Sequence, residues 1–248
     1  MAHLANIMAD AAGLLSRRLL PGVFAGLVGA LALWSASPAW SEASATDFEE
    51  GVHYERLPVA VDTSDPSRIE VVEVFSYACI HCKTFEPAIE AWLETKPEDV
   101  DFQRLPATFN QAWAALAQGY YTAEALGVVD QVHGAMFRAI HDRRVNLADP
   151  ALMAELFEAA AGIPPEQFSQ VFNSFSVRSR VQQADGGARV YRITGTPSLI
   201  VDGTYRVDAR MAGSHEEMLA VVDYLVERQR QQRSSTTGSS TADAGQGQ

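Results

Sequence analysis

Apolar and polar residues alternate with two different periods along the chain, and each change of period marks a predicted element. Residues 69–75 are rich in β-branched side chains and almost continuously apolar, which predicts a central strand that is covered on both faces. In residues 79–95 the apolar side chains recur at helical spacing, although Pro87 removes one hydrogen bond and should kink the helix. A further strand follows at 100–105, so this region predicts a β-α-β unit.

A long block with helical patterns follows, between about 108 and 185. Stripes of aromatic and aliphatic side chains predict four helices in it. The third of these begins with Asp149 as its N-cap and ends at Gly162. The fourth begins at Pro165 and should turn its aromatic residues inward, Phe175 included. We interpret the stripes as a small helical core rather than as a cofactor site.

The chain then returns to a pattern typical of strands. Two short β-rich segments flank the dipeptide Asp202-Gly203, which is a strong signal for a two-residue hairpin turn. An amphipathic helix follows from Glu216 to about Arg228. The order β-α-β, helical block, β-β-α predicts one α/β domain with a helical insertion.

The first 39 residues have the pattern of an export signal. Two arginines precede an apolar run at 19–34, and the small residues up to Ala39 fit a cleavage site. The alternative is an uncleaved membrane anchor, because the run approaches the length of a membrane span. Both alternatives place the folded part in the periplasm or otherwise outside the cytoplasm, in an oxidising compartment where disulfides persist.

Composition limits the classes of partner. The 248 residues carry a formal net charge of −12 at pH 7, which does not suit a nucleic-acid-binding protein. Residues 230–248 are mostly polar and small, and predict a disordered tail. His133 and His141 are eight residues apart, which is not the spacing of a zinc-binding helix, and the cysteine pair has no second pair to complete a zinc site. We therefore expect no metal.

Candidate chemistry lies in Cys79 and Cys82, the only cysteines, at the junction between the first strand and its helix. A thiol at a helix start faces unpaired N–H groups and the positive end of the helix dipole, which favour the thiolate. We predict that Cys79 is the nucleophile and that Cys82, one turn further, is more buried. His81 adds a positive charge in this interpretation, and the alternative is a loop histidine without a role. An inert structural disulfide is disfavoured, because closing so short a loop removes little chain entropy.

Together these motifs resemble the DsbA branch of the thioredoxin-fold family. The shared features are the C-x-H-C motif at a strand-to-helix junction, the tripeptide Gly195-Thr196-Pro197 before the late hairpin, and the long helical block between them. The resemblance covers about residues 47–229. Further segments carry it at 48–54, 111–114 and 172–175.

The resemblance implies a thioredoxin-like fold with an inserted helical subdomain, in which Thr196–Pro197 is a cis peptide that faces the cysteines and presents backbone groups to a substrate. The implied function is that of an exported thiol:disulfide oxidoreductase that donates the Cys79–Cys82 disulfide to unfolded exported proteins through a mixed disulfide at Cys79. A membrane-bound, quinone-linked partner would reoxidise the pair, and no cofactor besides the redox-active disulfide is implied. We recognise no dimerisation region and expect a monomer.

The resemblance also draws attention to three charged residues. Glu73 lies in the middle of the apolar strand, where an unpaired carboxylate would be costly, and Glu86 lies one turn beyond Cys82. Both match positions where the family places acids beneath the active site, and Arg104 matches the basic partner. A proton relay or a tuning of the Cys82 thiol is one interpretation, and the alternative is a structural ion pair or, for Glu86, a solvated helix face.

Ile80 stands where the family commonly has proline, so the family's redox potential does not carry over to this chain.

Two alternatives for the function stay open at this point. A disulfide reductase or isomerase would keep the cysteines reduced. A non-catalytic peptide-binding chaperone would use the Thr196–Pro197 groove without the cysteines.

Overall fold

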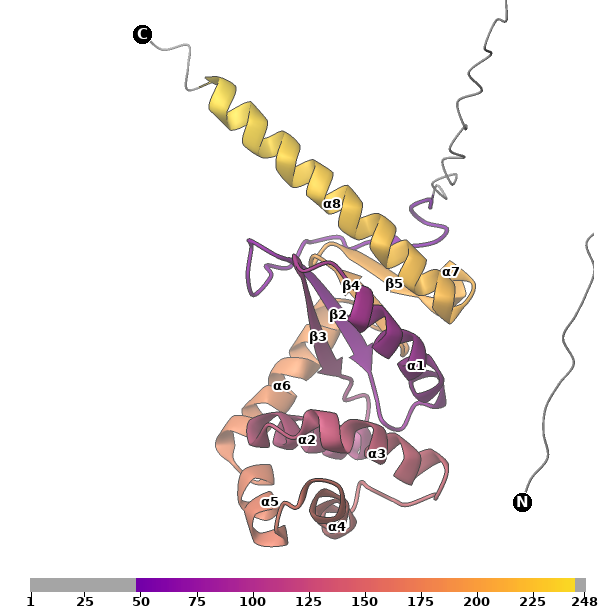
Figure 1. The fold of residues 1–248 in the computed structure, drawn as a ribbon, viewed down its shortest axis with the longest axis vertical. Helices are drawn as coiled ribbons and strands as arrows, with labels where there is room; N and C mark the ends of the chain where they lie inside the picture. The colour runs from indigo at the N-terminus through magenta and orange to yellow at the C-terminus, as the bar shows by residue number, and fades with distance from the viewer. Residues whose placement is uncertain (1–47, 244–248) are drawn as a thin grey trace, which may run out of the picture. The chain divides into compact units, whose positions relative to one another are not determined.

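The computed structural model describes residues 48–243, so the predicted export signal or anchor in residues 1–39 lies outside the described residues. Figure 1 shows a sheet with helices packed against it and a group of helices at one end. The elements, in chain order, are β1 (Glu55–Arg56), β2 (Ile69–Phe75), α1 (Ile80–Thr95), β3 (Val100–Pro106), α2 (Gln111–Leu126), α3 (Val129–His141), α4 (Pro150–Ala161), α5 (Pro165–Phe172), α6 (Phe175–Val190), β4 (Ser198–Val201), β5 (Tyr205–Asp208), α7 (Ala209–Ala212) and α8 (His215–Asp243).

The five-stranded sheet has the order β1-β5-β4-β2-β3. Strands β2 and β3 are parallel and joined by α1, which confirms the predicted β-α-β unit. Strand β4 pairs antiparallel with β2 and continues through the predicted hairpin into β5. All seven residues of β2 are buried, as its apolar composition predicts for a strand with neighbours on both sides and both faces covered.

Side chains of β2 alternate between two apolar layers. Ile69 and Val71 pack with apolar residues of α1 and α8 on one face. Val72 and Val74 pack on the opposite face, with residues of the segments that flank the helical insertion. By the same alternation Glu73 lies on the α1 face, which places its carboxylate near the residues that follow the cysteines.

The helical insertion, α2 to α6, has a core of its own that also includes Tyr77 and Cys82. The caps of α4 confirm the prediction, since Asp149 accepts a hydrogen bond from the N–H of Ala151 and Gly162 ends the helix at φ 68°. The predicted fourth helix is correct at its start but wrong at its end. It stops at Phe172, and Ser174 caps a new helix, α6, whose first residue Phe175 is 81% exposed rather than buried.

The hairpin between β4 and β5 turns at Asp202 and Gly203, both at positive φ, 51° and 56°. A side chain at Gly203 would place its Cβ 1.9 Å from the carbonyl oxygen of Val61, so only glycine fits there. The two residues therefore form the tight turn that the sequence predicts.

Helix α8 does not end near Arg228, and the disordered tail predicted from residue 230 is wrong as far as Asp243, because the helix continues to that residue. Two arginines of the extension hold it to the body. Arg230 pairs with Asp99 through Nε and Nη2 at 2.7 and 2.6 Å, and Arg233 pairs with Asp202 at 2.6 Å. Glutamine and arginine are also good helix formers, so local propensity and these contacts act together.

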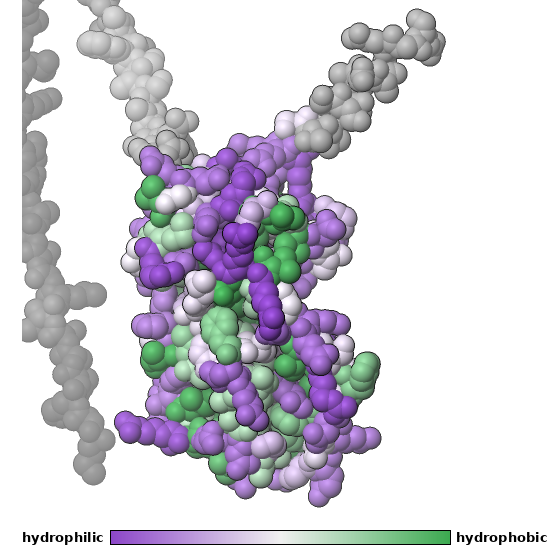
Figure 2. Space-filling model, turned by 180° about the vertical axis from the view of Figure 1, so that it is seen from behind, coloured by the Kyte–Doolittle hydropathy of each residue, from purple (hydrophilic) through white to green (hydrophobic). Residues whose placement is uncertain are grey.

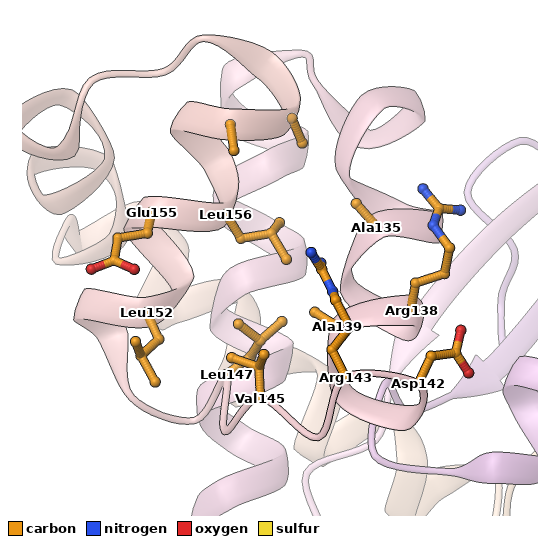
Figure 3. A pocket seen from close by; sticks show the side chains of 12 residues that line it. Ala135, Arg138, Ala139, Asp142, Arg143, Val145, Leu147, Leu152, Glu155 and Leu156 are labelled. Atoms are coloured by element: carbon orange, nitrogen blue, oxygen red, sulfur yellow. The ribbon is translucent and has the colours of Figure 1, made fainter.

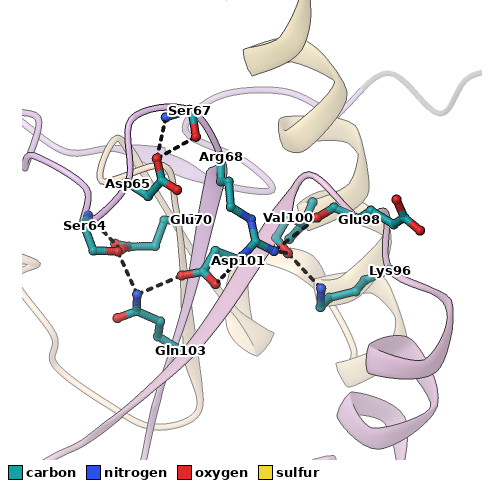
Figure 4. A network of polar contacts seen from close by, with 10 residues as sticks. All are labelled: Ser64, Asp65, Ser67, Arg68, Glu70, Lys96, Glu98, Val100, Asp101 and Gln103. Atoms are coloured by element: carbon teal, nitrogen blue, oxygen red, sulfur yellow. Dashed lines mark hydrogen bonds and ion pairs between the residues drawn. The ribbon is translucent and has the colours of Figure 1, made fainter.

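A polar network holds the start of β2 beside the start of β3 (Figure 4). Arg68 donates to the carbonyl oxygen of Val100 (2.9 Å) and pairs with Asp101 (3.1 Å). Glu70 accepts hydrogen bonds from the N–H and hydroxyl of Ser64 (3.1 and 2.7 Å). These contacts fix the register of the two strands at one end, and the register places the residues at their other end, next to the cysteines.

The surface is largely hydrophilic on the face shown in Figure 2, with apolar side chains between the polar ones over the helical insertion. Among the helices within residues 48–243, none combines the length and the apolar character needed to cross a bilayer. The large hydrophobic side chains that are exposed in this part of the chain are Val52, Val59, Ile80, Phe109, Phe175 and Val190.

Candidate active site

Cys79 is the N-cap residue of α1 and lies just after β2, as predicted. Its backbone is extended (φ −88°, ψ 116°), and its carbonyl accepts the N–H of Lys83 at 3.2 Å, the first bond of the helix. The Cys79 side chain is half-buried, whereas Cys82, one turn later, is fully buried. Both are free thiols in this structure. The pair therefore has one accessible and one inaccessible sulfur.

The two thiols have opposite acidities. The pKa of Cys79 is lowered to about 5, chiefly by a hydrogen bond from the Cys82 side chain, with further hydrogen bonds from the Thr196 side chain and the backbone N–H groups of Cys82 and His81. The pKa of Cys82 is raised far above its usual value, chiefly by burial and then by its hydrogen bond to Cys79 and the nearby charges of Cys79 and Glu73. Near neutral pH one sulfur is a thiolate and the other keeps its proton.

His81 contributes to the Cys79 site through its backbone N–H. Its side chain is exposed and lines a cavity of about 460 Å³ beside Pro197. A contribution from charge on the ring itself stays a prediction. Ile80, between Cys79 and His81, is 48% exposed, so an apolar side chain stands at the entrance to the site.

The loop with Thr196 and Pro197 meets the cysteines, although it lies more than a hundred residues later in the chain. The Sγ of Cys79 lies 3.3 Å from the carbonyl oxygen of Thr196, to which it donates a hydrogen bond when it is protonated. The Thr196–Pro197 peptide bond is cis, as the resemblance implied. Residues of this loop line the 460 Å³ cavity together with residues from the end of β5, α7 and the start of α8. A groove thus lies beside the accessible sulfur.

Glu73, Glu86 and Arg104 meet beneath the cysteines. Arg104 donates from Nε to Glu73 Oε2 at 3.0 Å and from Nη2 to Glu86 Oε1 at 2.6 Å. The first contact follows from the sheet, in which Glu73 and Arg104 are register partners on adjacent strands. The structure brings the three residues together as expected, whereas their role in the chemistry stays a prediction.

The two acids differ in their surroundings. Burial raises the pKa of Glu73 to about 7, even though Arg104 acts in the opposite direction. Burial also acts on Glu86, but its close contacts with His133, at 3.0 Å, and with Arg104, at 2.6 Å, outweigh it, so the pKa of Glu86 is lowered. The guanidinium of Arg104 pairs with both carboxylates. Because the pKa of Glu73 is the higher of the two, a proton bound by this pair of acids near neutral pH resides on Glu73.

His133, His141 and Tyr77 belong to this site, and sequence reasoning missed them. Tyr77 donates to or accepts from His133 Nδ1 at 2.7 Å, and its carbonyl oxygen lies 2.8 Å from His141 Nε2. The sequence-based expectation for the two histidines concerns only metal binding. Their spacing of eight residues puts both on the same face of a helix, and that signal could have indicated a shared contact.

A second cavity, of about 690 Å³, lies between α3 and α4 (Figure 3). Aliphatic side chains line it, among them Val145, Leu147 and Leu152, with charged residues at its rim. None of the predicted site residues lines it. Within residues 48–243, no group of three or more His, Cys, Asp or Glu side chains is arranged to bind a metal ion.

Comparison with known proteins links this geometry to a family. A family model described as a DSBA-like thioredoxin domain matches residues 96–220. The protein named thiol:disulfide interchange protein DsbA in Pseudomonas aeruginosa is 43% identical over 188 residues, which are 76% of this chain and 89% of that protein. The protein of the same name in Azotobacter vinelandii is 42% identical over 214 residues, 86% of this chain and 98% of the relative.

Solved structures agree with the sequence relatives. The crystal structure of Pseudomonas aeruginosa DsbA superimposes with a TM-score of 0.72 at 41% identity, covering 75% of this chain and 97% of that one. The oxidoreductase DsbA from Xylella fastidiosa gives a TM-score of 0.69 at 35% identity, covering 74% of this chain and 98% of that one. The mixed α/β architecture described above is therefore a thioredoxin-like fold with a helical insertion.

Proposed function

Because this chain belongs to the DsbA family of thiol:disulfide oxidoreductases, we propose that it donates the Cys79–Cys82 disulfide to exported proteins while they fold. The observation that carries the proposal is the contrast between the two sulfurs. Cys79 is half-buried with a pKa of about 5, and Cys82 is fully buried with a raised pKa. Such a pair is attacked at one sulfur and releases that sulfur readily.

The first step forms a mixed disulfide. A thiolate of the substrate attacks the Sγ of Cys79, the bond between Cys79 and Cys82 breaks, and the electron pair goes to Cys82. The buried Cys82 sulfur cannot stay ionised and takes up a proton. Glu73, with a pKa of about 7 in the same buried region, is suited to exchange that proton at neutral pH.

The second step releases the oxidised substrate. A second substrate thiolate attacks the substrate sulfur of the mixed disulfide, and Cys79 leaves as a thiolate. Two electrons have then moved from the substrate to the enzyme. Of the two protons that the substrate thiols lose, one is held by Cys82 and the other is released to solvent, because Cys79 remains ionised at neutral pH. A leaving thiolate of low pKa favours transfer toward the substrate.

Substrate binding is assigned to the loop with Thr196 and Pro197. The carbonyl oxygen of Thr196 lies 3.3 Å from the Cys79 sulfur, so an extended substrate segment bound along this loop would present its cysteine to Cys79. The adjacent 460 Å³ cavity offers space for a neighbouring substrate side chain. Ile80, which is exposed and follows Cys79 directly in the chain, would offer the substrate an apolar contact.

The cellular setting is part of the proposal. An oxidising function requires an extracytoplasmic location, which agrees with the signal-like pattern in residues 1–39. Each turnover leaves the pair reduced, so the cycle requires an oxidant, for which we propose a membrane-bound, quinone-linked partner. A monomer is sufficient for both steps, because every group named lies in one chain.

The oxidised fraction of the cysteine pair, measured after the full chain is equilibrated with glutathione at varied ratios, distinguishes the proposed oxidase function from a reductase or isomerase function. A strong oxidant becomes mostly reduced at glutathione ratios at which a pair poised like that of thioredoxin is still oxidised. A pair that stayed oxidised until the buffer was strongly reducing would refute the oxidase. Cys79→Ser addresses the chaperone alternative, since oxidation of a reduced peptide should disappear in this variant whereas chaperone activity would persist.

A further inference from the structure

The cavity of about 460 Å³ beside Pro197 has three basic side chains in its wall and one acidic side chain. The basic side chains are His81 of α1, Arg210 of α7 and His215 of α8, and the acid is Asp208 of β5. The chain as a whole has the opposite balance, with 31 Asp and Glu against 19 Lys and Arg. The wall of this cavity is therefore a local exception in an acidic protein.

The one acid, Asp208, is engaged in the fold. Its Oδ1 accepts the N–H groups of Arg210 and Met211 at 3.0 and 3.1 Å, so it is the N-cap of α7. Its Oδ2 lies 3.6 Å from Nη2 of Arg210, and it is the only acid that pairs with this arginine within residues 48–243. Because the Arg210 side chain is 81% exposed, most of its five N–H donors are left for a ligand.

The two histidines of the wall add hydrogen-bond donors. Each ring carries at least one N–H, whether it is neutral or charged. The His215 ring packs on Phe85 with 4.9 Å between the ring centroids, which restricts its orientation, and His81 lies between the two cysteines. Glu216 and Glu217 follow His215 in the chain but do not line the cavity. An anion in the cavity would therefore meet donors from three elements.

We propose that this cavity selects substrates that carry an acidic side chain next to the reactive cysteine, and that Arg210 determines this preference. The proposal rests on the function proposed above, because it concerns the substrate of the same site. A segment bound along the Thr196–Pro197 loop with its cysteine at Cys79 places a neighbouring side chain at the cavity. A carboxylate in that position can accept two parallel hydrogen bonds from the guanidinium of Arg210.

Two charge effects act on an acidic substrate, and they have opposite signs. The net charge of −12 repels it, although at physiological ionic strength this repulsion is screened beyond about 8 Å. Pairing with Arg210 attracts it at contact, and an exposed ion pair changes an affinity by about twofold to fivefold. A preference for acidic over neutral substrates would therefore report the local contact rather than the charge of the whole chain.

Reduced peptides that differ at one position test this preference. Each peptide has two cysteines, and the residue before or after the first cysteine is Glu, Gln or Lys. The oxidised full chain is mixed with each peptide, and the rate of peptide oxidation is measured by mass spectrometry after an acid quench. A charge also changes the reactivity of the thiol beside it. Each rate is therefore divided by the rate at which the same peptide reduces hydroxyethyl disulfide, which is uncharged.

Three variants connect the preference to one side chain. Arg210→Gln removes the charge and Arg210→Glu reverses it. Arg189→Gln is the matched control, because the Arg189 side chain is 78% exposed and also pairs with one acid, but it lies on α6 and does not line the cavity. Thermal unfolding of each variant shows whether the fold is kept.

In the wild type and in Arg189→Gln, the Glu peptide should react about twofold to fivefold faster than the Gln peptide at one of the two positions. Arg210→Gln should abolish this difference, and Arg210→Glu should favour the Lys peptide. Equal rates for the Glu and Gln peptides in the wild type, or the same preference in all four proteins, would overturn the proposal and leave the oxidase function intact. If the wild type oxidised none of the peptides, the proposed function would fail, and the proposed preference with it.

Discussion

Replacing Glu73 by Gln removes a charge from the most buried acid of the site and keeps the shape of the side chain. Glu73 has no exposed surface, and its Oε1 has no hydrogen-bond partner within the described residues. Burial raises the carboxyl pKa from 4.5 to about 7. The folded chain therefore binds this proton more tightly than the unfolded chain does, and ionisation of Glu73 opposes folding.

The size and sign of the effect follow from this shift. Each pKa unit corresponds to about 1.4 kcal/mol, so ionised Glu73 destabilises the folded chain by about 3 kcal/mol. Stability from the protonated carboxyl is fully present below pH 4.5 and is lost as the pH rises through about 7. Glu73→Gln cannot ionise, so relative to wild type it should gain about 3 kcal/mol between pH 4.5 and pH 8.

Denaturant unfolding at a series of pH values measures this gain directly. Both proteins are compared in the same redox state, so that the cysteines contribute equally. Glu70→Gln is a matched control for the substitution on the same buried strand, because Glu70 has two hydrogen bonds from Ser64 that the carbonyl oxygen of Gln can still accept. Parallel stability curves for wild type and Glu73→Gln would refute the argument, and an unchanged redox equilibrium would rule out a proton relay through Glu73.

Three further predictions follow from the thiols and the hairpin. Cys82→Ala removes the hydrogen bond that contributes most to the low pKa of Cys79, so the thiolate titration followed by ultraviolet absorbance should move upward from about 5. The pKa of Cys79 is about 5 in the folded chain and 9.0 without the fold, so its thiolate stabilises the folded, reduced chain. This stabilisation is fully present above pH 9 and is lost as the pH falls through about 5. The difference in unfolding free energy between reduced and oxidised chains should therefore grow from pH 5 toward pH 9, and a constant difference would contradict it. Gly203→Ala should lower the unfolding free energy by more than about 1 kcal/mol, because its Cβ would meet the Val61 carbonyl, whereas Gly186→Ala, with open space in a helix, should raise it by up to about 1 kcal/mol.

Local signals in the sequence predicted most of the fold. The cap residues of α4 and the Asp202-Gly203 turn act within a few residues, so their patterns are readable without tertiary structure. The start of α6 was missed because Phe175 continues the aromatic stripe of α5, while the Ser174 cap that interrupts it is a weaker signal. The extension of α8 was missed because its pairings join residues more than thirty positions apart.

In the candidate site, too, features set by local sequence could be predicted, whereas contacts set by tertiary packing could not. The place of Cys79 at a helix start is a local property, and the prediction is confirmed. The contact between Glu73 and Arg104 depends on the register of two parallel strands, which the β-α-β pattern suggests but does not specify. The contact of His133 with Glu86 depends on how the insertion packs against α1, and no pattern in either segment encodes that distance.

The contact between Cys79 and Thr196 joins residues 117 positions apart, with the whole helical insertion between them. During synthesis from the N-terminus, the thiol pair is therefore complete long before the loop that it contacts. A chain that has emerged only as far as α6 carries both cysteines but lacks the partner residues and the strand β4 that pairs with β2. The contact between Cys79 and Thr196 therefore forms only when the last strands of the chain itself have been added.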